Sequence, residues 1–186
     1  MCMVDGITKK SVAAMLGTII GVVVSGAFAL IFGQVTSITG YNVSDIENLV
    51  YVGEMTDIKI GELLFAGILI ASLGAVMDVG MSIASTLNEL KEQNPQMMLK
   101  ELFQSGMNVG RDMMGTMTNT LILAFTGGSI NTLVFIFAYN YEYQQVINMY
   151  SVGIEIMQGL SSSLGVIMAV PVTSWIAAFL YSKNQK

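Results

Sequence analysis

Long apolar stretches separated by polar segments dominate the pattern of this sequence. A helix needs about 20 mainly apolar residues to cross the hydrocarbon core of a bilayer. The pattern therefore predicts membrane-spanning helices at about 11–33, 61–85, 107–126 and 158–182. We expect one all-α domain over residues 1–186, a polytopic helical membrane protein surrounded by the lipid bilayer.

A further apolar stretch, at 130–150, is harder to assign. Its apolar part, Ile130 to Ala138, is too short to cross a bilayer alone, and Gly127-Gly128 breaks the helix before it. The mixture of tyrosines and polar residues at 139–143 is typical of a membrane–water boundary. We predict a re-entrant or interfacial segment, with a tilted full span as the alternative, so that the fold has four to five transmembrane helices.

The segment at 95–106 has the pattern of an amphipathic helix. Pro95 follows Asn94 and should end or kink a helix that runs on from the second span. Apolar residues recur on one side of the piece that follows: Met97, Met98, Leu102 and Phe103. This pattern predicts a helix lying at the membrane interface.

Basic residues predict the orientation. They gather at Lys9 and Lys10, at 91–111, and at Lys183 and Lys186, and such residues mark cytoplasmic segments. Four spans place all three regions in the cytoplasm, whereas a fifth would put the C-terminal lysines outside. We therefore expect a cytoplasmic N-terminus and an outward-facing acidic segment between the first two spans.

The first apolar stretch has two readings. A basic start before an apolar run, followed by Ala27-Phe28-Ala29, is also typical of a cleaved signal peptide. The run continues apolar through Phe32, which favours a membrane span. Gly17, Gly21 and Ser25 recur at four-residue intervals in it, and such small residues let another helix approach closely.

Composition supports a membrane protein and excludes several kinds of chemistry. The sequence is 53% hydrophobic and only 11% charged, whereas soluble domains carry about 25% charged residues. It has no histidine and one cysteine, Cys2, which excludes histidine-based catalysis, an internal disulfide and multi-cysteine metal sites. We expect no metal and no cofactor. The net charge is −5 and the basic residues are scattered, so nucleic acid is not an expected partner.

Polar residues inside the second span form the first part of a candidate site. Small and polar positions recur every three or four residues and share one helix face: Gly67, Ala71, Gly74, Asp78, Ser82 and Ser85. An ionised aspartate at the centre of a membrane helix costs at least about 2.5 kcal/mol. Asp78 should therefore face protein or water, either as a functional group or as a satisfied packing residue.

The start of the third span is more polar still. Asp112, Thr116, Asn119 and Thr120 share one face of the predicted helix, and Arg111 lies beside them. Such a helix should run through the middle of the bundle or along a hydrated cavity. Arg111 either pairs with a carboxylate or extends to the cytoplasmic interface. The candidate relay or substrate-path residues are Asp78, Ser82, Arg111, Asp112, Thr116, Asn119 and Thr120.

Two composite runs, 74–85 and 105–116, resemble the YibE/F family of multi-pass bacterial membrane proteins. The resemblance extends from about Gly6 onward and includes 165–171. It implies the bacterial cytoplasmic membrane and no particular activity. Family members usually have further hydrophobic segments upstream, which implies a truncated member, or one completed by a companion YibE-like chain or by further copies of itself.

A weaker likeness connects the chain to one half of the SecD/SecF and RND-type proton-driven exporters. It rests on an aspartate-bearing span, the acidic run 89–92, and Thr118-Asn119-Thr120 in the next span. The likeness implies proton uptake and release through Asp78, Arg111 and Asp112. The large extracytoplasmic insertion of those exporters is missing, and only part of one half is present.

We therefore expect a membrane transport or export component, proton-coupled through carboxylates inside the membrane. The alternative is a non-catalytic scaffold or subunit of a two-component YibE/YibF-like complex. An intramembrane aspartyl protease is disfavoured, because Gly110-Arg111-Asp112 lacks the Gly-Xaa-Gly-Asp pattern and Arg111 would hold the neighbouring aspartate ionised. We expect no enzyme activity.

Overall fold

The computed structural model describes residues 8–42, 50–51, 53, 55–56 and 58–182. Over these residues the regular structure is entirely helical, with no strand. The long helices are α2 (Lys9–Thr36), α4 (Ile60–Gln93), α5 (Leu99–Gly128) and α8 (Tyr150–Ser182). Shorter helices are η1 (Gly40–Asn42), α6 (Ile130–Ala138) and α7 (Tyr143–Ile147). The all-α prediction is confirmed.

Three of the long helices, α2, α4 and α8, are each long and apolar enough to cross a membrane. The more polar α5 meets the same criteria only together with α6, from which it is bent by 54°. The described chain thus has three candidate spans, or four if the bent pair counts as one. This number agrees with a polytopic helical membrane protein.

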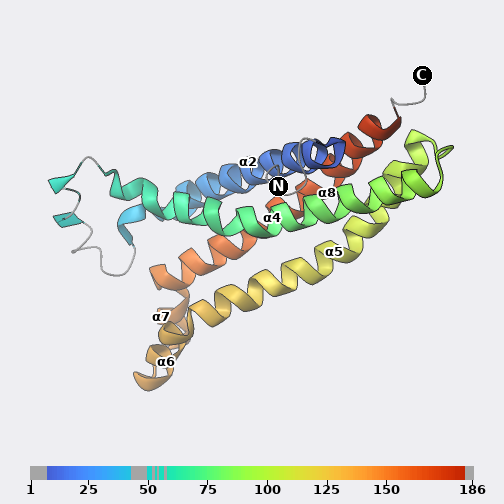
Figure 1. Cartoon of the computed structure of the whole chain (residues 1–186). Helices are drawn as coiled ribbons and strands as arrows, with labels where there is room; N and C mark the ends of the chain where they lie inside the picture. The colour runs from blue at the N-terminus through green and yellow to red at the C-terminus, as the bar shows by residue number, and fades with distance from the viewer. Residues whose placement is uncertain (1–7, 43–49, 52, 54, 57, 183–186) are drawn as a thin grey trace.

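The four long helices lie side by side, with α8 in contact with each of the other three (Figure 1). Small residues make the closest contacts. Gly17, Gly21 and Ser25 are buried on α2, and Gly21 lies against Ala169 of α8. The prediction that this stripe admits another helix is confirmed.

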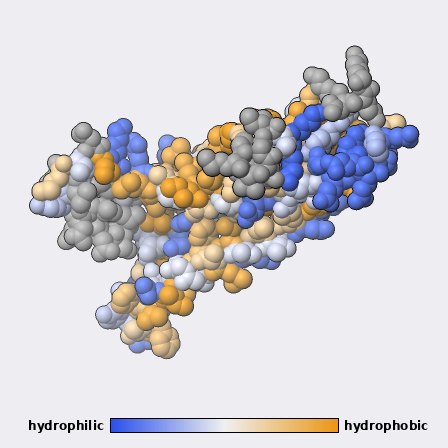
Figure 2. All heavy atoms as spheres, in the orientation of Figure 1, coloured by the Kyte–Doolittle hydropathy of each residue, from blue (hydrophilic) through white to orange (hydrophobic). Residues whose placement is uncertain are grey.

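The start of α2 and the end of α8 lie at the same end of the bundle, where Lys9 Nζ donates a 3.4 Å hydrogen bond to the carbonyl oxygen of Leu180. Thr8 caps α2 there, because its side chain accepts from the backbone N–H of Ser11 at 3.2 Å. The turn from α4 to α5 is at this end too (Figure 1). Figure 2 shows hydrophilic side chains concentrated around this turn and hydrophobic ones over the middle of the molecule.

The helices extend beyond several of the predicted membrane spans. The segment at 95–106 is no separate interfacial helix, because α5 runs unbroken from Leu99 into the third predicted span. Helix α4 continues past the predicted second span to Gln93, as the expected break at Pro95 implies, and α8 begins at Tyr150, before the predicted last span at 158. Residues such as Glu92, Glu155 and Gln158 are good helix formers, so a helix need not end where hydrophobicity ends.

The breaks between helices agree better with the sequence. The helix before Pro95 ends at Gln93, and α5 ends at Gly128, beside the predicted glycine break. The segment at 130–150 divides into α6, α7 and the first residue of α8, at the end of the bundle opposite the α4–α5 turn (Figure 1). Its bend from α5 fits either a broken span or a re-entrant segment.

Candidate functional site

Two glycines fix how α5 lies against α4 and α8. A Cβ atom added at Gly106 would lie 3.0 Å from Leu87 Cδ1 and 2.8 Å from Ser174 Oγ. One turn further on, a Cβ at Gly110 would lie 3.1 Å from Ile83 Cδ1. Helices α4 and α5 are antiparallel. A residue further along α5 therefore lies level with a residue nearer the start of α4.

Continuing this pairing of α5 residues with α4 residues shows which predicted site residues lie level with one another along the bundle. Asp78 comes about level with Gly115, and Gly74 about level with Asn119. Arg111 lies four residues from Gly115, a rise of roughly 6 Å. The second and third predicted spans therefore carry their polar residues at neighbouring heights in the bundle.

Beyond Gly110 the surfaces of α4 and α5 no longer touch at these positions. A Cβ atom added at Gly74 or Gly115 would have nothing within 4 Å of it. The glycines at the centre of the polar runs thus face open space in this chain.

The predicted site residues are mostly exposed. Asp78, Arg111, Asp112, Thr116, Asn119 and Thr120 are exposed, and Ser82 is half-buried. We call these seven residues the polar face. The buried positions of α5 are instead Leu102, Gly106 and Gly110. Of the two expectations for α5, a course through the middle of the bundle is wrong for this chain, because α5 packs through its small-residue side and its polar side is exposed. The other expectation, a hydrated cavity along the polar side, stays a prediction.

Hydrogen bonds on the polar face stay within α5. Thr116 Oγ1 donates to the carbonyl oxygen of Asp112 at 3.3 Å, and Thr120 Oγ1 to that of Thr116 at 2.9 Å. Among the described residues, no ion pair or hydrogen bond joins Asp78 to Arg111 or Asp112. In the described part of the chain, the proposed charge partners are thus not bonded to one another.

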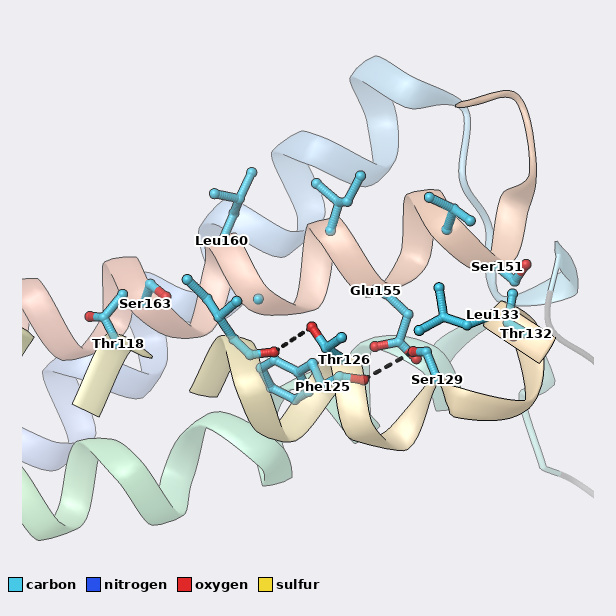
Figure 3. A pocket seen from close by; sticks show the side chains of 14 residues that line it. Thr118, Phe125, Thr126, Ser129, Thr132, Leu133, Ser151, Glu155, Leu160 and Ser163 are labelled. Atoms are coloured by element: carbon cyan, nitrogen blue, oxygen red, sulfur yellow. Dashed lines mark hydrogen bonds between the residues drawn. The ribbon is translucent and has the colours of Figure 1, made fainter. Parts of the chain in front are cut away.

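Glu155 is a charged residue that sequence reasoning missed. It is half-buried and lines a crevice of about 400 Å³ formed by α5, α6 and α8 (Figure 3). The predicted segment at 130–150 ended before this glutamate and the predicted last span began after it, at 158, so Glu155 belonged to no predicted element. A signal for it was present in the sequence, because Ser151 and Gln158 lie four residues before and three residues after Glu155, on the same helix face.

Metal ligands do not gather in the described part of the chain: no group of three or more cysteine, aspartate or glutamate side chains there could hold an ion. The polar face offers hydroxyl, amide, carboxylate and guanidinium groups instead. Such groups can exchange protons or hydrogen-bond a polar solute, provided that lipid is kept away from them.

Long apolar helices packed through small residues are typical of a multi-helix membrane protein. The model of the YibE/F-like protein family matches residues 1–183, and the chain belongs to the YibE/F family. No curated protein and no solved structure matches the chain. The family resemblance is confirmed, whereas the likeness to SecD/SecF and RND-type exporters gains no support from these comparisons.

Proposed function

We propose that this chain is a component of a membrane transport or export system of the bacterial cytoplasmic membrane. In this proposal the polar face of α4 and α5 lines the path of a proton or polar solute. A companion YibE-like chain or a second copy covers that face. One observation carries the proposal: Asp78, Arg111 and Asn119 are exposed on helices that otherwise suit a bilayer.

The position of Asp78 along α4 is the physical reason. It is 15 residues from the end of the helix at Gln93 and 18 from its start at Ile60, which are distances of roughly 22 and 27 Å. Asp78 is thus close to the middle of the helix, where contact between a charged group and hydrocarbon is most costly. Water or protein must cover the polar face in the membrane.

The residues then have separate roles. Asp78 takes up and releases a proton, since a carboxylate away from bulk water is easily shifted between its two states by a nearby charge. Arg111 and Asp112, close to one level on α5, set the affinity of Asp78 for that proton. Asn119 and the threonine hydroxyls hydrogen-bond water or solute along the path.

Water access tests the path directly. Single cysteines are placed in a Cys2→Ser background at Asn119 and, as a matched control, at Val23, which is 64% exposed on α2. We expect a membrane-impermeant thiol reagent to modify Asn119→Cys much faster than Val23→Cys in intact membranes. Equal, slow modification at both sites would reject a hydrated path.

Proton uptake tests the relay. Full-length protein in liposomes is given an external acid step while an internal dye reports pH. We expect Asp78→Asn to lower uptake, whereas Glu62→Gln, at the exposed start of α4, leaves it unchanged. If both Asp78→Asn and Arg111→Ala left uptake unchanged, the relay would be abandoned.

The open space at Gly74 and Gly115 favours a second candidate, a non-catalytic subunit that uses the polar face only to dock another helix. Thermal melting of the membrane assembly separates the two candidates. For a scaffold, Asp78→Asn and Asp112→Asn lower the melting temperature without a selective loss of proton uptake. Neither candidate is an enzyme.

A further inference from the structure

The crevice around Glu155 shares no lining residue with the polar face. Its walls are mostly apolar and come from α5, α6 and α8: Ile122, Phe125, Leu133, Val152, Ile156 and Leu160. Gly159 leaves room at its centre, since a Cβ atom there would still be 3.7 Å from Phe125 Cδ2. The volume of about 400 Å³ is in the range of small-molecule sites.

Of the described residues that line this crevice, Glu155 alone is charged. Its carboxylate points toward the α5 side near Ser129 (Figure 3). The neighbouring hydroxyls are already used, because Ser129 Oγ donates to the carbonyl oxygen of Phe125 at 3.0 Å and Thr126 Oγ1 to that of Ile122 at 2.8 Å. The side chain of Glu155 has no hydrogen bond or ion pair with another described residue.

The crevice is polar at the end that holds Glu155, and its walls are apolar from there toward Ser163. Gly153, just before Glu155, lies against Ile38 beyond the end of α2, which places Glu155 at the outer end of the bundle. Exposed tyrosines typical of a membrane interface occur in the same part of the chain: Tyr139, Tyr141, Tyr143 and Tyr150. From Glu155 to Ser163, at the other end of the crevice, α8 rises roughly 12 Å toward the membrane interior.

The charge near the Glu155 end of the crevice favours a positively charged ligand. Among the described residues of the segments 34–62 and 139–155, three are acidic, Glu62, Glu142 and Glu155, and one is basic, Lys59. That lysine, Lys59, lies 3.4 Å from Glu62 in an ion pair. A surplus of negative charge raises the local concentration of cations and repels anions.

We propose that the crevice between α5, α6 and α8 binds a single-tailed amphipathic cation from the outer leaflet. The cationic head lies at Glu155 at the membrane interface, and the hydrocarbon tail follows the apolar walls toward Ser163. The site does not depend on the proposed transport role, because it shares no residue with the polar face and its occupancy is measured without transport.

Photolabelling in bilayers tests this site. Three probes share a dodecyl tail with a diazirine near its middle and differ only in the head: trimethylammonium, hydroxyl or carboxylate. They are added to the full-length chain in phosphatidylcholine nanodiscs, and labelled peptides are identified by mass spectrometry. We expect the cationic probe to label the crevice walls about tenfold more than the carboxylate probe, the effect of a charge-assisted contact.

Two variants and a control sharpen the test. Glu155→Gln keeps the shape of the side chain and should remove the preference for the cation, leaving the hydroxyl probe unaffected. Gly159→Leu should fill the crevice and reduce labelling by all three probes. Glu142→Gln, an exposed carboxylate in the same part of the chain, should change nothing. If Glu155→Gln does not fold, competition in the unchanged protein replaces it, and unlabelled dodecyltrimethylammonium should displace the cationic probe better than dodecanol does.

Several results would overturn the site. Equal labelling by cation and carboxylate, or a preference for the carboxylate, would remove the role of charge. If Glu155→Gln still preferred the cationic probe, the cationic head would lie elsewhere. The same would follow if dodecanol displaced the cationic probe as well as dodecyltrimethylammonium does. No labelling by any probe would mean that a protein segment, not an amphiphile, covers the crevice.

Discussion

The hydroxyl of Tyr181 donates a 3.2 Å hydrogen bond to the backbone carbonyl oxygen of Ala84, joining α8 to α4 across a buried contact. Ala84 is fully buried and Tyr181 is 5% exposed. The bond lies near the end of α8, where Lys9 also reaches the carbonyl oxygen of Leu180. Three helices are thus joined at the end of the bundle that carries the α4–α5 turn.

Removing this hydroxyl should weaken the bundle. We expect Tyr181→Phe to lower the free energy of unfolding by about 1 kcal/mol, the usual net value of a buried hydrogen bond. Thermal melting in detergent measures it. Tyr150→Phe, at an exposed tyrosine, is the matched control, and an equal loss in both variants would contradict a specific role for the bond.

The contact of Gly17 with α8 should tolerate no side chain. A Cβ atom there would meet Thr173 Oγ1 and lie 2.9 Å from Thr173 Cβ and 3.3 Å from its Cα, so the backbone of α8 would have to move. We expect Gly17→Ala to destabilise the chain by about 1–3 kcal/mol. Gly67→Ala, with nothing within 4 Å of the added atom, should cause no loss in the same melting assay.

Gly74 should matter for assembly rather than for the fold of one chain. The open space around it means that Gly74→Leu should leave the melting of the isolated chain unchanged. The larger side chain should keep a partner helix away from the polar face. Native mass spectrometry of the complex extracted from membranes measures assembly, and full assembly of the variant would contradict docking at this face.

Orientation can be tested at two exposed positions in a Cys2→Ser background. Asn94 lies in the α4–α5 turn, and Tyr141 lies between α6 and α7. The basic residues predict that Asn94→Cys reacts from the cytoplasmic side and Tyr141→Cys from the outside. An impermeant thiol reagent applied to intact cells and to inverted vesicles measures this, and the opposite pattern would reverse the topology.

Hydrophobic length and small-residue spacing made the long helices and the Gly17 stripe predictable, because both depend on periodicity within one segment. Periodicity places Asp78 and Gly74 on one side of a helix without saying which way that side points. The outward direction follows from Gly106 and Gly110, which bring the other side of α5 against its neighbours. Glu155 was missed for a similar reason, since only the packing of α8 against α5 makes its surroundings a crevice.

The bend at Ser129 gives the α5–α6 pair a property that the straight helices lack. With its nine residues, α6 is roughly 14 Å long, and at 54° to α5 it adds roughly 8 Å along the α5 axis. Straightening the bend would lengthen the pair by roughly 6 Å. If the pair forms one span, the angle at Ser129 therefore sets the bilayer thickness that it matches.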